Sequence, residues 1–322
     1  MELKEFLMNI FSITDYGETH HKLTFLGIKL KYPRWEYYLK KKENIFYYYK
    51  KHNKNITELP PATGKIRDIQ LANLALLNEL DYVCHRAGLT YWLDGGTLLG
   101  AVRHKGFIPW DDDIDIAMLR EDYEKLIDAF EKYSRDSDIY VDYYRSEIAP
   151  NMRYLRVLHR KSSHLFVDVF PWDTYGDILS EREQLAISAD ILKFLKNFKI
   201  SASKLTDFEL ETAIKDIMKT KYLKSNSDKK GKDSDYVWGI DFNHPFDNWF
   251  WRYDVLNPLK TIVFEGYEFP CMNKEEEFLT KLYKDYMAYP NSITMGHSIF
   301  LNLSKEELET IKSLAEKNKV RS

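Results

Sequence analysis

The most constraining feature of this sequence is the run from residue 93 to residue 118, in which glycines come first and aspartates follow. The glycines are Gly95, Gly96 and Gly100, and the aspartates are Asp111, Asp112, Asp113 and Asp115. Trp110, Ile114 and Ile116 flank the aspartates and predict partial burial. Buried carboxylates repel one another unless a cation compensates their charge. The run therefore predicts a charged site set against a packed core.

The glycines predict a turn that opens a helix. In such a turn the backbone N–H groups point toward an anion, as they do at phosphate-binding helix N-termini. Glycine also lets the backbone approach a ligand closely. We therefore predict that Gly95, Gly96 and Thr97 bind the phosphates of a substrate.

The aspartates predict a metal site. Asp113 and Asp115 are two positions apart on a predicted strand, so they share one face of it. Asp168 lies between bulky apolar residues on a second predicted strand and completes a three-aspartate set. Carboxylate oxygens are the ligands that Mg²⁺ (or Mn²⁺) prefers, and two such ions can clamp a phosphoryl transfer. The predicted metal ligands are Asp113, Asp115 and Asp168, with the alternatives that the aspartate run is a capped turn and that Asp168 pairs with an arginine.

Other polar residues of the same region receive supporting roles. Asp111 and Asp112 are predicted to orient the site or to act as the general base for an acceptor hydroxyl. Arg103 and Lys105 are predicted to neutralise pyrophosphate charge, the alternative being ordinary exposed basic residues.

The pattern along the chain predicts an α+β fold, because strands and helices mix without regular alternation. Apolar residues at three- and four-residue steps predict a helix over residues 66–86. Further helices are expected over 97–103, 120–133, 181–197, 207–221, 273–287 and 304–317, and strands over 90–93, 114–118, 139–144, 154–158, 165–170 and 261–269. The polar stretch 224–235 is expected to be a mobile loop.

Residues 1–62 differ from the rest and are predicted to form a separate basic and aromatic subdomain, ahead of a catalytic domain over 63–322. Between residues 20 and 54 lysines alternate with aromatic residues, which is typical of solvated surface or of contact with anionic headgroups. With 47 Lys and Arg against 50 Asp and Glu, the net charge of −3 argues against nucleic acid as a partner. The sequence shows no membrane span or signal peptide, so a cytoplasmic protein is expected, with peripheral contact at the inner face of the membrane as the functional interpretation of the basic segment.

An aromatic-rich segment extends from Tyr236 to Tyr253. Aromatic rings can enclose a quaternary ammonium, so Trp249 and Trp251 are predicted to bind the head group of a substrate. The alternatives are an aromatic core or a platform for a sugar.

The residues from Tyr91 to Met118 resemble the signature region of the LicD family, bacterial phosphocholine transferases related to the fukutin proteins. The run Asp94-Gly-Gly-Thr-Leu-Leu-Gly-Ala-Val-Arg103 and the run Gly106-Phe-Ile-Pro-Trp-Asp-Asp-Asp-Ile-Asp-Ile116 carry the likeness. Shorter pieces continue it at Val167-Asp-Val-Phe-Pro171, Phe264-Glu-Gly266 and Leu282-Tyr283, so that it spans roughly residues 70–290. Lys284 departs from the glycine that often follows Leu-Tyr in the family.

The resemblance implies a nucleotidyltransferase-like mixed sheet with flanking helices and an added C-terminal segment. It implies transfer of phosphocholine, or a similar phospho-alcohol, from a CDP-linked donor to a sugar hydroxyl of a cell-surface glycan or lipid-linked sugar, with release of CMP. By resemblance the metal carboxylates are Asp113, Asp115 and Asp168. Transfer of glycerol phosphate, ribitol phosphate or phosphoethanolamine, nucleotidyl transfer, and a non-catalytic binding module remain alternatives.

Overall fold

The structure is a computed structural model of the chain. It describes residues 11–16, 20–25, 28–33, 46–47, 49–53, 55–145, 153–175, 206, 209, 235–238, 250–290 and 303–319. The chain divides into two compact units. The first comprises residues 1–59 and 289–302, and the second comprises residues 60–288 and 303–322. Two of the predicted helices, over 181–197 and 207–221, and the predicted polar loop over 224–235 lie outside the described residues, apart from isolated positions.

The first unit contains an antiparallel three-stranded sheet. Its strands are β1 (Phe11–Tyr16), β2 (His20–Phe25) and β3 (Ile28–Pro33), followed by the short helix η1 (Ile56–Glu58). Tyr289 returns to this unit, where its hydroxyl donates to the Asn53 carbonyl at 3.0 Å. The side chains of residues 1–45 are outside the described set, so the predicted membrane contact stays a prediction.

The second unit is organised around a mixed sheet to which seven of the described strands belong. These are β4 (Trp92–Leu93), β5 (Asp115–Leu119), β6 (Ile139–Arg145), β7 (Arg153–His159), β8 (Ser162–Tyr175), β9 (Asp235–Trp238) and β10 (Phe250–Trp251). The main path is β10-β9-β8-β5-β4, while β6 pairs with β7 and β7 with β8. Strand β8 is long enough that its first part pairs with β7 and its last part with β9.

The pairing of β5 with β8 positions the site. It is parallel, whereas the other pairings among the described strands are antiparallel. Its register sets Asp115 beside Asp168, and the backbone N–H of Asp168 donates to the Ile114 carbonyl at 2.8 Å. The two predicted acidic strands are therefore direct neighbours.

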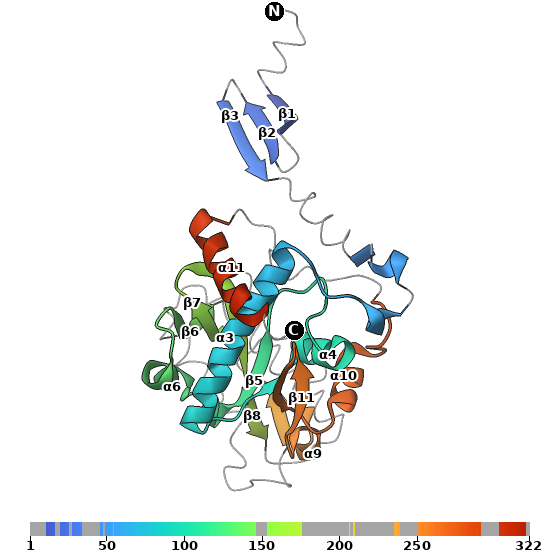
Figure 1. The fold of residues 1–322 in the computed structure, drawn as a ribbon, viewed down its shortest axis with the longest axis vertical. Helices are drawn as coiled ribbons and strands as arrows, with labels where there is room; N and C mark the ends of the chain where they lie inside the picture. The colour runs from blue at the N-terminus through green and yellow to red at the C-terminus, as the bar shows by residue number, and fades with distance from the viewer. Residues whose placement is uncertain are drawn as a thin grey trace, which may run out of the picture. The chain divides into compact units, whose positions relative to one another are not determined.

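Helices and a β-hairpin cover this sheet. The helices are α3 (Lys65–Ala87), α4 (Gly95–His104), α5 (Arg120–Tyr123), α6 (Leu126–Tyr133), α9 (Tyr253–Leu256), α10 (Glu275–Tyr283) and α11 (Lys305–Lys319), and the hairpin strands are β11 (Lys260–Phe264) and β12 (Tyr267–Cys271). Helix α3 buries Leu74, Leu77 and Leu80 and ends at Gly88, whose φ of 68° is the left-handed value that glycine allows. Figure 1 shows α3 and α11 crossing side by side, and the two helices are in extensive contact.

The predicted α+β class is confirmed, with two differences in the helices. The single helix expected over residues 120–133 is two helices, because the Glu124 and Lys125 N–H groups bond back to Arg120 and Asp122 in a tight turn. The helix expected over 273–287 ends at Tyr283, where Lys284 has a φ of 62° that breaks the helix.

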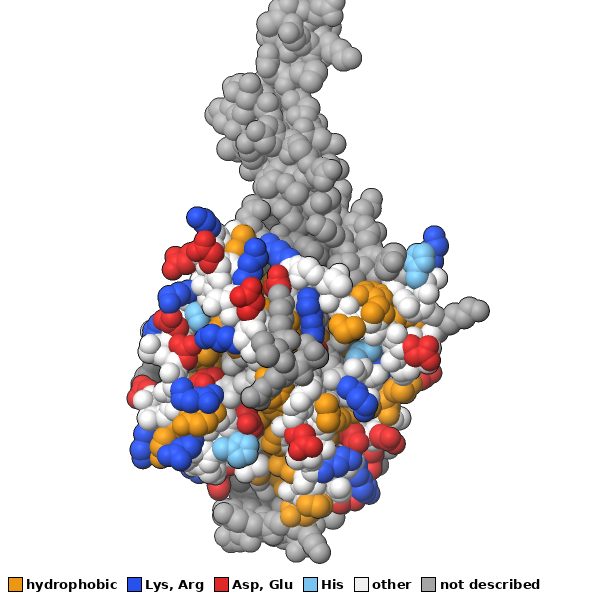
Figure 2. All heavy atoms as spheres, in the orientation of Figure 1, with side chains coloured by type: hydrophobic (Ala, Val, Ile, Leu, Met, Phe, Trp, Pro, Cys, Tyr) orange, Lys and Arg blue, Asp and Glu red, His pale blue; other side chains and the backbone are white. Residues whose placement is uncertain are grey.

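Three further observations concern the cysteines, the helices and the surface of the described residues. Cys84 and Cys271 are buried free thiols. Within the described part of the chain, no helix combines the length and apolarity needed to cross a bilayer. Among the coloured residues of Figure 2, acidic and basic side chains are intermixed over the visible face of the second unit.

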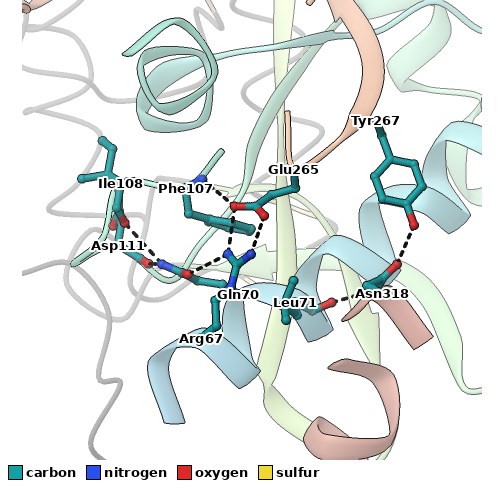
Figure 3. Close-up of polar contacts among 9 residues, drawn as sticks. All are labelled: Arg67, Gln70, Leu71, Phe107, Ile108, Asp111, Glu265, Tyr267 and Asn318. Carbon is teal, nitrogen blue, oxygen red and sulfur yellow. Dashed lines mark hydrogen bonds and ion pairs between the residues drawn. The ribbon is translucent and has the colours of Figure 1, made fainter. Parts of the chain in front are cut away.

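Asn318 ties α11 to the rest of the second unit, which leads to a stability prediction. Its amide nitrogen donates to the Leu71 carbonyl of α3 at 3.0 Å, and its oxygen accepts from the Tyr267 hydroxyl at 3.1 Å (Figure 3). Replacing it by leucine leaves buried polar groups unsatisfied, so Asn318→Leu should lower the free energy of unfolding by about 1–3 kcal/mol in urea titrations. Tyr267→Phe is the control, since it removes one of these bonds. Equal losses of unfolding free energy in Asn318→Leu and Tyr267→Phe would contradict this linking role of Asn318.

Candidate active site

The site begins where strand β4 turns into helix α4. Asp94 caps the helix: one carboxylate oxygen accepts from the Gly95 N–H at 2.8 Å and the other from the Trp172 indole at 3.3 Å. The side chain is fully buried. Burial raises the pKa of Asp94 to about 6, even though both hydrogen bonds favour the carboxylate. Asp94 thus carries a proton more readily than an exposed aspartate.

The two glycines bring the start of α4 against the start of β5. Gly95 has a φ of 49°, and a Cβ atom there would lie 2.8 Å from a carboxylate oxygen of Asp115. The Gly96 N–H donates to the same oxygen at 3.2 Å, and the Thr97 hydroxyl accepts from the Asp115 N–H at 2.8 Å. Close approach was predicted for a phosphate, and in this structure it is Asp115 that the glycines approach. Phosphate binding by Gly95, Gly96 and Thr97 stays a prediction.

The aspartate run forms a compact acidic cluster. Asp111, Asp112 and Asp113 each present a carboxylate oxygen, and these oxygens lie within 4.8 Å of one another. Asp115 belongs to the same charged region, because burial and then the negative charges of Asp113, Asp168 and Asp111 raise its pKa well above the usual value. The structure therefore brings together the four aspartates of the run.

Asp168 adjoins Asp115 in the sheet and also has a basic partner. The Arg156 guanidinium donates to its two oxygens at 2.5 and 3.2 Å, and the Tyr154 hydroxyl donates at 3.3 Å. Arg156 is itself held over the rings of Tyr144 and Phe166, at 3.5 and 4.1 Å from their centroids. The pairing with an arginine is the alternative that the sequence left open. A metal ligand role for Asp168 stays a prediction, in which a cation shares the carboxylate with Arg156.

Arg103 and Lys105 lie at the other end of α4. With a rise of about 1.5 Å per residue, Arg103 is about 12 Å along the helix from Gly95. Arg103 is buried, and its guanidinium donates to the Tyr286 carbonyl at 3.0 Å and to His104 at 2.8 Å. Burial and then the charge of Arg103 lower the pKa of His104 to about 3, so the imidazole is neutral at pH 7. The structure thus sets neither Arg103 nor Lys105 beside the glycine turn.

Of the two tryptophans predicted to bind the head group, the structure describes Trp251. Trp251 is buried, packs on Phe278 with ring centroids 4.6 Å apart, and stacks on Trp172 at 6.3 Å. The Lys281 ammonium lies 4.1 Å from the centre of its ring. This environment favours the core-packing alternative for Trp251. Trp249 lies outside the described residues.

Sequence reasoning missed three residues of this region. Asp94 precedes a helix start, and its N-cap position was the signal that could have revealed it. Arg156 carries no local sequence signal, because only strand pairing brings it to Asp168. Tyr283 is 39% exposed, yet loss of hydration and then the charges of Asp115 and Asp94 raise the pKa of its phenol well above the usual value. Its phenol therefore belongs to the surroundings of the acidic cluster.

The acidic cluster fits a divalent cation. Three carboxylate oxygens within 4.8 Å of one another are the hard oxygen donors that Mg²⁺ and Mn²⁺ take. Burial and then the charges of Asp113 and Asp168 raise the pKa of Asp115 beside them. Asp113 and Asp115 would hold such an ion, with the carboxylates of Asp111 and Asp112 close beside them. A mixed sheet with aspartates on adjacent parallel strands, beside a Gly-Gly helix start, defines a nucleotidyltransferase-like domain.

Comparison with known proteins agrees with this class. Residues 88–174 match the domain family described as LicD/FKTN/FKRP, nucleotidyltransferase domain. Over 246 residues, which are 70% of this chain and 92% of the relative, the sequence is 29% identical to lipopolysaccharide cholinephosphotransferase LicD of Haemophilus influenzae. Over 112 residues, 34% of this chain, it is 35% identical to human ribitol 5-phosphate transferase FKRP, of which this match covers 22%. The chain is therefore similar to LicD proteins, and residues 88–174 match their nucleotidyltransferase domain.

A substitution at Gly95 tests whether the glycine turn serves the acidic site. Gly95→Ala should cost about 1–2 kcal/mol of stability because of its positive φ, and should also displace Asp115 and abolish most activity. Gly88→Ala is the matched control, since Gly88 has a φ of 68° but nothing within 4 Å of the added Cβ. Thermal unfolding and product release would be measured for both. Equal activity in the two variants would show that the turn is only a backbone requirement.

The raised pKa of Asp94 predicts a pH-dependent stability. Between about pH 4 and pH 6 the folded state binds more protons at this position than the unfolded state, so its contribution to stability falls as pH rises. Asp94→Asn removes this dependence. Relative to wild type, the variant should gain up to about 3 kcal/mol in free energy of unfolding from pH 4 to pH 7, measured with a chelator present. Parallel stability curves for the two proteins would contradict the assignment.

Proposed function

We propose that this chain transfers a phospho-alcohol group, with phosphocholine as the first candidate, from a CDP-linked donor to a sugar hydroxyl of a glycan or lipid-linked sugar and releases CMP. The likeness to LicD and FKRP supports transfer of a phosphate-containing group, since both relatives are named for such transfers. The likeness to the cholinephosphotransferase covers 92% of that protein and supports phosphocholine as the group.

One observation carries the proposal: four neighbouring aspartates meet the N-terminus of a helix. The N–H of Gly96 points at Asp115, and the carboxylates of Asp111, Asp112 and Asp113 converge nearby. A helix N-terminus favours negative charge, whereas a carboxylate cluster repels a phosphate unless cations intervene. The two features together suit a donor whose phosphates are bound through divalent cations.

Bound Mg²⁺ or Mn²⁺ would neutralise the donor phosphates and stabilise charge on the leaving CMP oxygen. Asp113 and Asp115, with Asp168, are the proposed ligands, and Asp111 or Asp112 is the proposed general base. That base takes the proton of the sugar hydroxyl while the hydroxyl oxygen bonds to the donor phosphorus that carries the choline or other alcohol. The bond from that phosphorus to the CMP oxygen breaks, and CMP leaves with the electron pair.

A second candidate is transfer of ribitol phosphate. The match to the human ribitol 5-phosphate transferase supports it, although that match covers 34% of this chain. Glycerol phosphate and phosphoethanolamine are chemically similar groups.

We further propose a cytoplasmic location, with the basic residues between 20 and 54 contacting anionic headgroups at the inner face of the membrane.

The experiment is a panel of CDP-choline, CDP-ribitol, CDP-glycerol and CDP-ethanolamine with Mg²⁺ and a glycan acceptor, with CMP as the measured product. We expect CDP-choline to release CMP fastest. Preference for CDP-ribitol would move the proposal to the second candidate. Release of pyrophosphate from CTP would support nucleotidyl transfer, and the absence of any turnover would support a binding module.

A charge-removing substitution tests the carboxylates. Asp113→Asn should lower turnover at least about a hundredfold, because charge stabilisation by a metal is worth several kcal/mol. Asp142→Asn is the control, since the Asp142 side chain is exposed on β6, and this variant should keep wild-type turnover. Retention of more than about a tenth of wild-type turnover by folded Asp113→Asn would remove Asp113 from the metal site.

A further inference from the structure

Helix α3 carries two buried amide side chains on its otherwise apolar inner face. Gln70 is fully buried and Asn73 is 1% exposed, among leucines such as Leu74 and Leu77. Burying a side-chain amide is costly unless its hydrogen bonds are made. These two amides therefore need hydrogen-bond partners that offset the free-energy cost of their burial.

Their partners are backbone carbonyls of the segment that carries the aspartates. The Gln70 amide donates to the Asp111 carbonyl at 2.6 Å and to the Ile108 carbonyl at 3.3 Å, and Figure 3 shows the side chain reaching across to both. The Asn73 amide donates to the Asp112 carbonyl at 2.7 Å. Its oxygen accepts from the Phe166 N–H of β8 at 3.0 Å, so Asn73 links the segment to the strand that carries Asp168.

A partly buried ion pair holds the beginning of the same segment. Arg67, one turn before Gln70 on α3, forms a two-bond pair with Glu265 at 2.8 and 2.6 Å. Glu265 also accepts from the Phe107 N–H at 3.0 Å, and its own N–H donates to the Lys105 carbonyl at 2.8 Å. Arg67 in turn donates to the Gln70 oxygen at 3.3 Å (Figure 3). Arg67, Gln70 and Glu265 are thus joined side chain to side chain, and Asn73 holds the same segment separately through the Asp112 carbonyl.

The close fit around Glu265 indicates that this contact is specific. Glu265 occupies the tip of the β11–β12 hairpin with a φ of 52°, an uncommon value for a non-glycine residue. A Cβ atom on Gly106 would lie 2.4 Å from a carboxylate oxygen of Glu265, so a larger residue at position 106 would have to displace the Glu265 side chain. The hairpin is thus coupled to the backbone of residues 105–107.

We propose that Arg67, Gln70, Asn73 and Glu265 are positioning residues for the acidic site. They hold residues 105–113 through main-chain groups, so that the mutually repelling carboxylates of Asp111, Asp112 and Asp113 stay within 4.8 Å of one another. Without these contacts, repulsion would spread the aspartates, and the site would lose affinity for a divalent cation. The inference rests on the proposed function as far as it assigns the cluster to a metal.

Two variants on α3 and one matched control test the proposal. Gln70→Met and Asn73→Leu remove the amide donors with little change in size. Asn78→Leu makes the same kind of loss on the same helix, where the Asn78 amide donates to Asn318 at 3.1 Å and not to the acidic segment. For each protein we would measure hydrogen exchange over residues 105–113, binding of Mn²⁺ alone by the loss of the free-ion resonance signal, and CMP release as a function of Mn²⁺ concentration.

We expect faster exchange over residues 105–113 in Gln70→Met and Asn73→Leu, with Mn²⁺ affinity weakened about tenfold. The Mn²⁺ concentration for half-maximal CMP release should rise by the same factor. Asn78→Leu should match wild type in all three, even where its thermal stability falls as much. Unchanged Mn²⁺ affinity in folded Gln70→Met and Asn73→Leu would overturn the positioning role.

The two proposals can fail separately. If the wild type binds Mn²⁺ and the variants bind it more weakly, but no CDP-alcohol yields CMP, the positioning role stands and the proposed reaction falls. If the wild type releases CMP and the variants keep its Mn²⁺ dependence, the reaction stands and the positioning role falls. A wild type that binds no Mn²⁺ alone overturns the positioning role, while CMP release decides the proposed reaction separately.

Discussion

Repulsion among carboxylates is the constraint on which the rest of this structure depends. Asp111, Asp112, Asp113 and Asp115 are crowded into one region, and the parallel pairing of β5 with β8 adds Asp168 beside them. Charges this close cannot all remain ionised at no cost, and the raised pKa of Asp115 is the direct sign of that cost. Each element around the site offsets part of the repulsion or holds the chain against it.

The compensation takes three physical forms. Arg156 neutralises Asp168 with a two-bond ion pair, while the N-terminus of α4 donates to Asp115 through the Gly96 N–H. On the other side, α3 and the β11–β12 hairpin hold the aspartate segment by its backbone. The partly buried pair of Arg67 with Glu265 fixes the geometry of this contact, since removing one partner would leave the other charge uncompensated. The mutually repelling carboxylates are thus held in place by the strands, helices and hairpin around them.

This arrangement explains why separate pieces of sequence accompany the aspartate run. Phe264-Glu-Gly266 was a weak match on its own, and the structure gives it a role: Glu265 binds Arg67 and the backbone N–H of Phe107. A Cβ atom on Gly106 would lie 2.4 Å from the Glu265 carboxylate, so glycine at position 106 leaves room for this contact. Lys284, which stands where the family often has glycine, ends α10 just after Tyr283 and has a φ of 62°, a value that glycine adopts more readily.

Local sequence determined the elements and the chemical character of the site. Apolar spacing predicted α3, the glycines predicted the start of α4, and the aspartate run predicted an acidic site, because each of these signals acts within a few residues. Tertiary structure alone decided the partners: Arg156 reaches Asp168 through the register of β7 with β8, and Glu265 reaches Arg67 across 198 residues of chain. It also decided that Trp251 is packed in the core and that Arg103 lies away from the glycine turn. Such pairings depend on strand register and helix packing, which are long-range properties that no local pattern encodes.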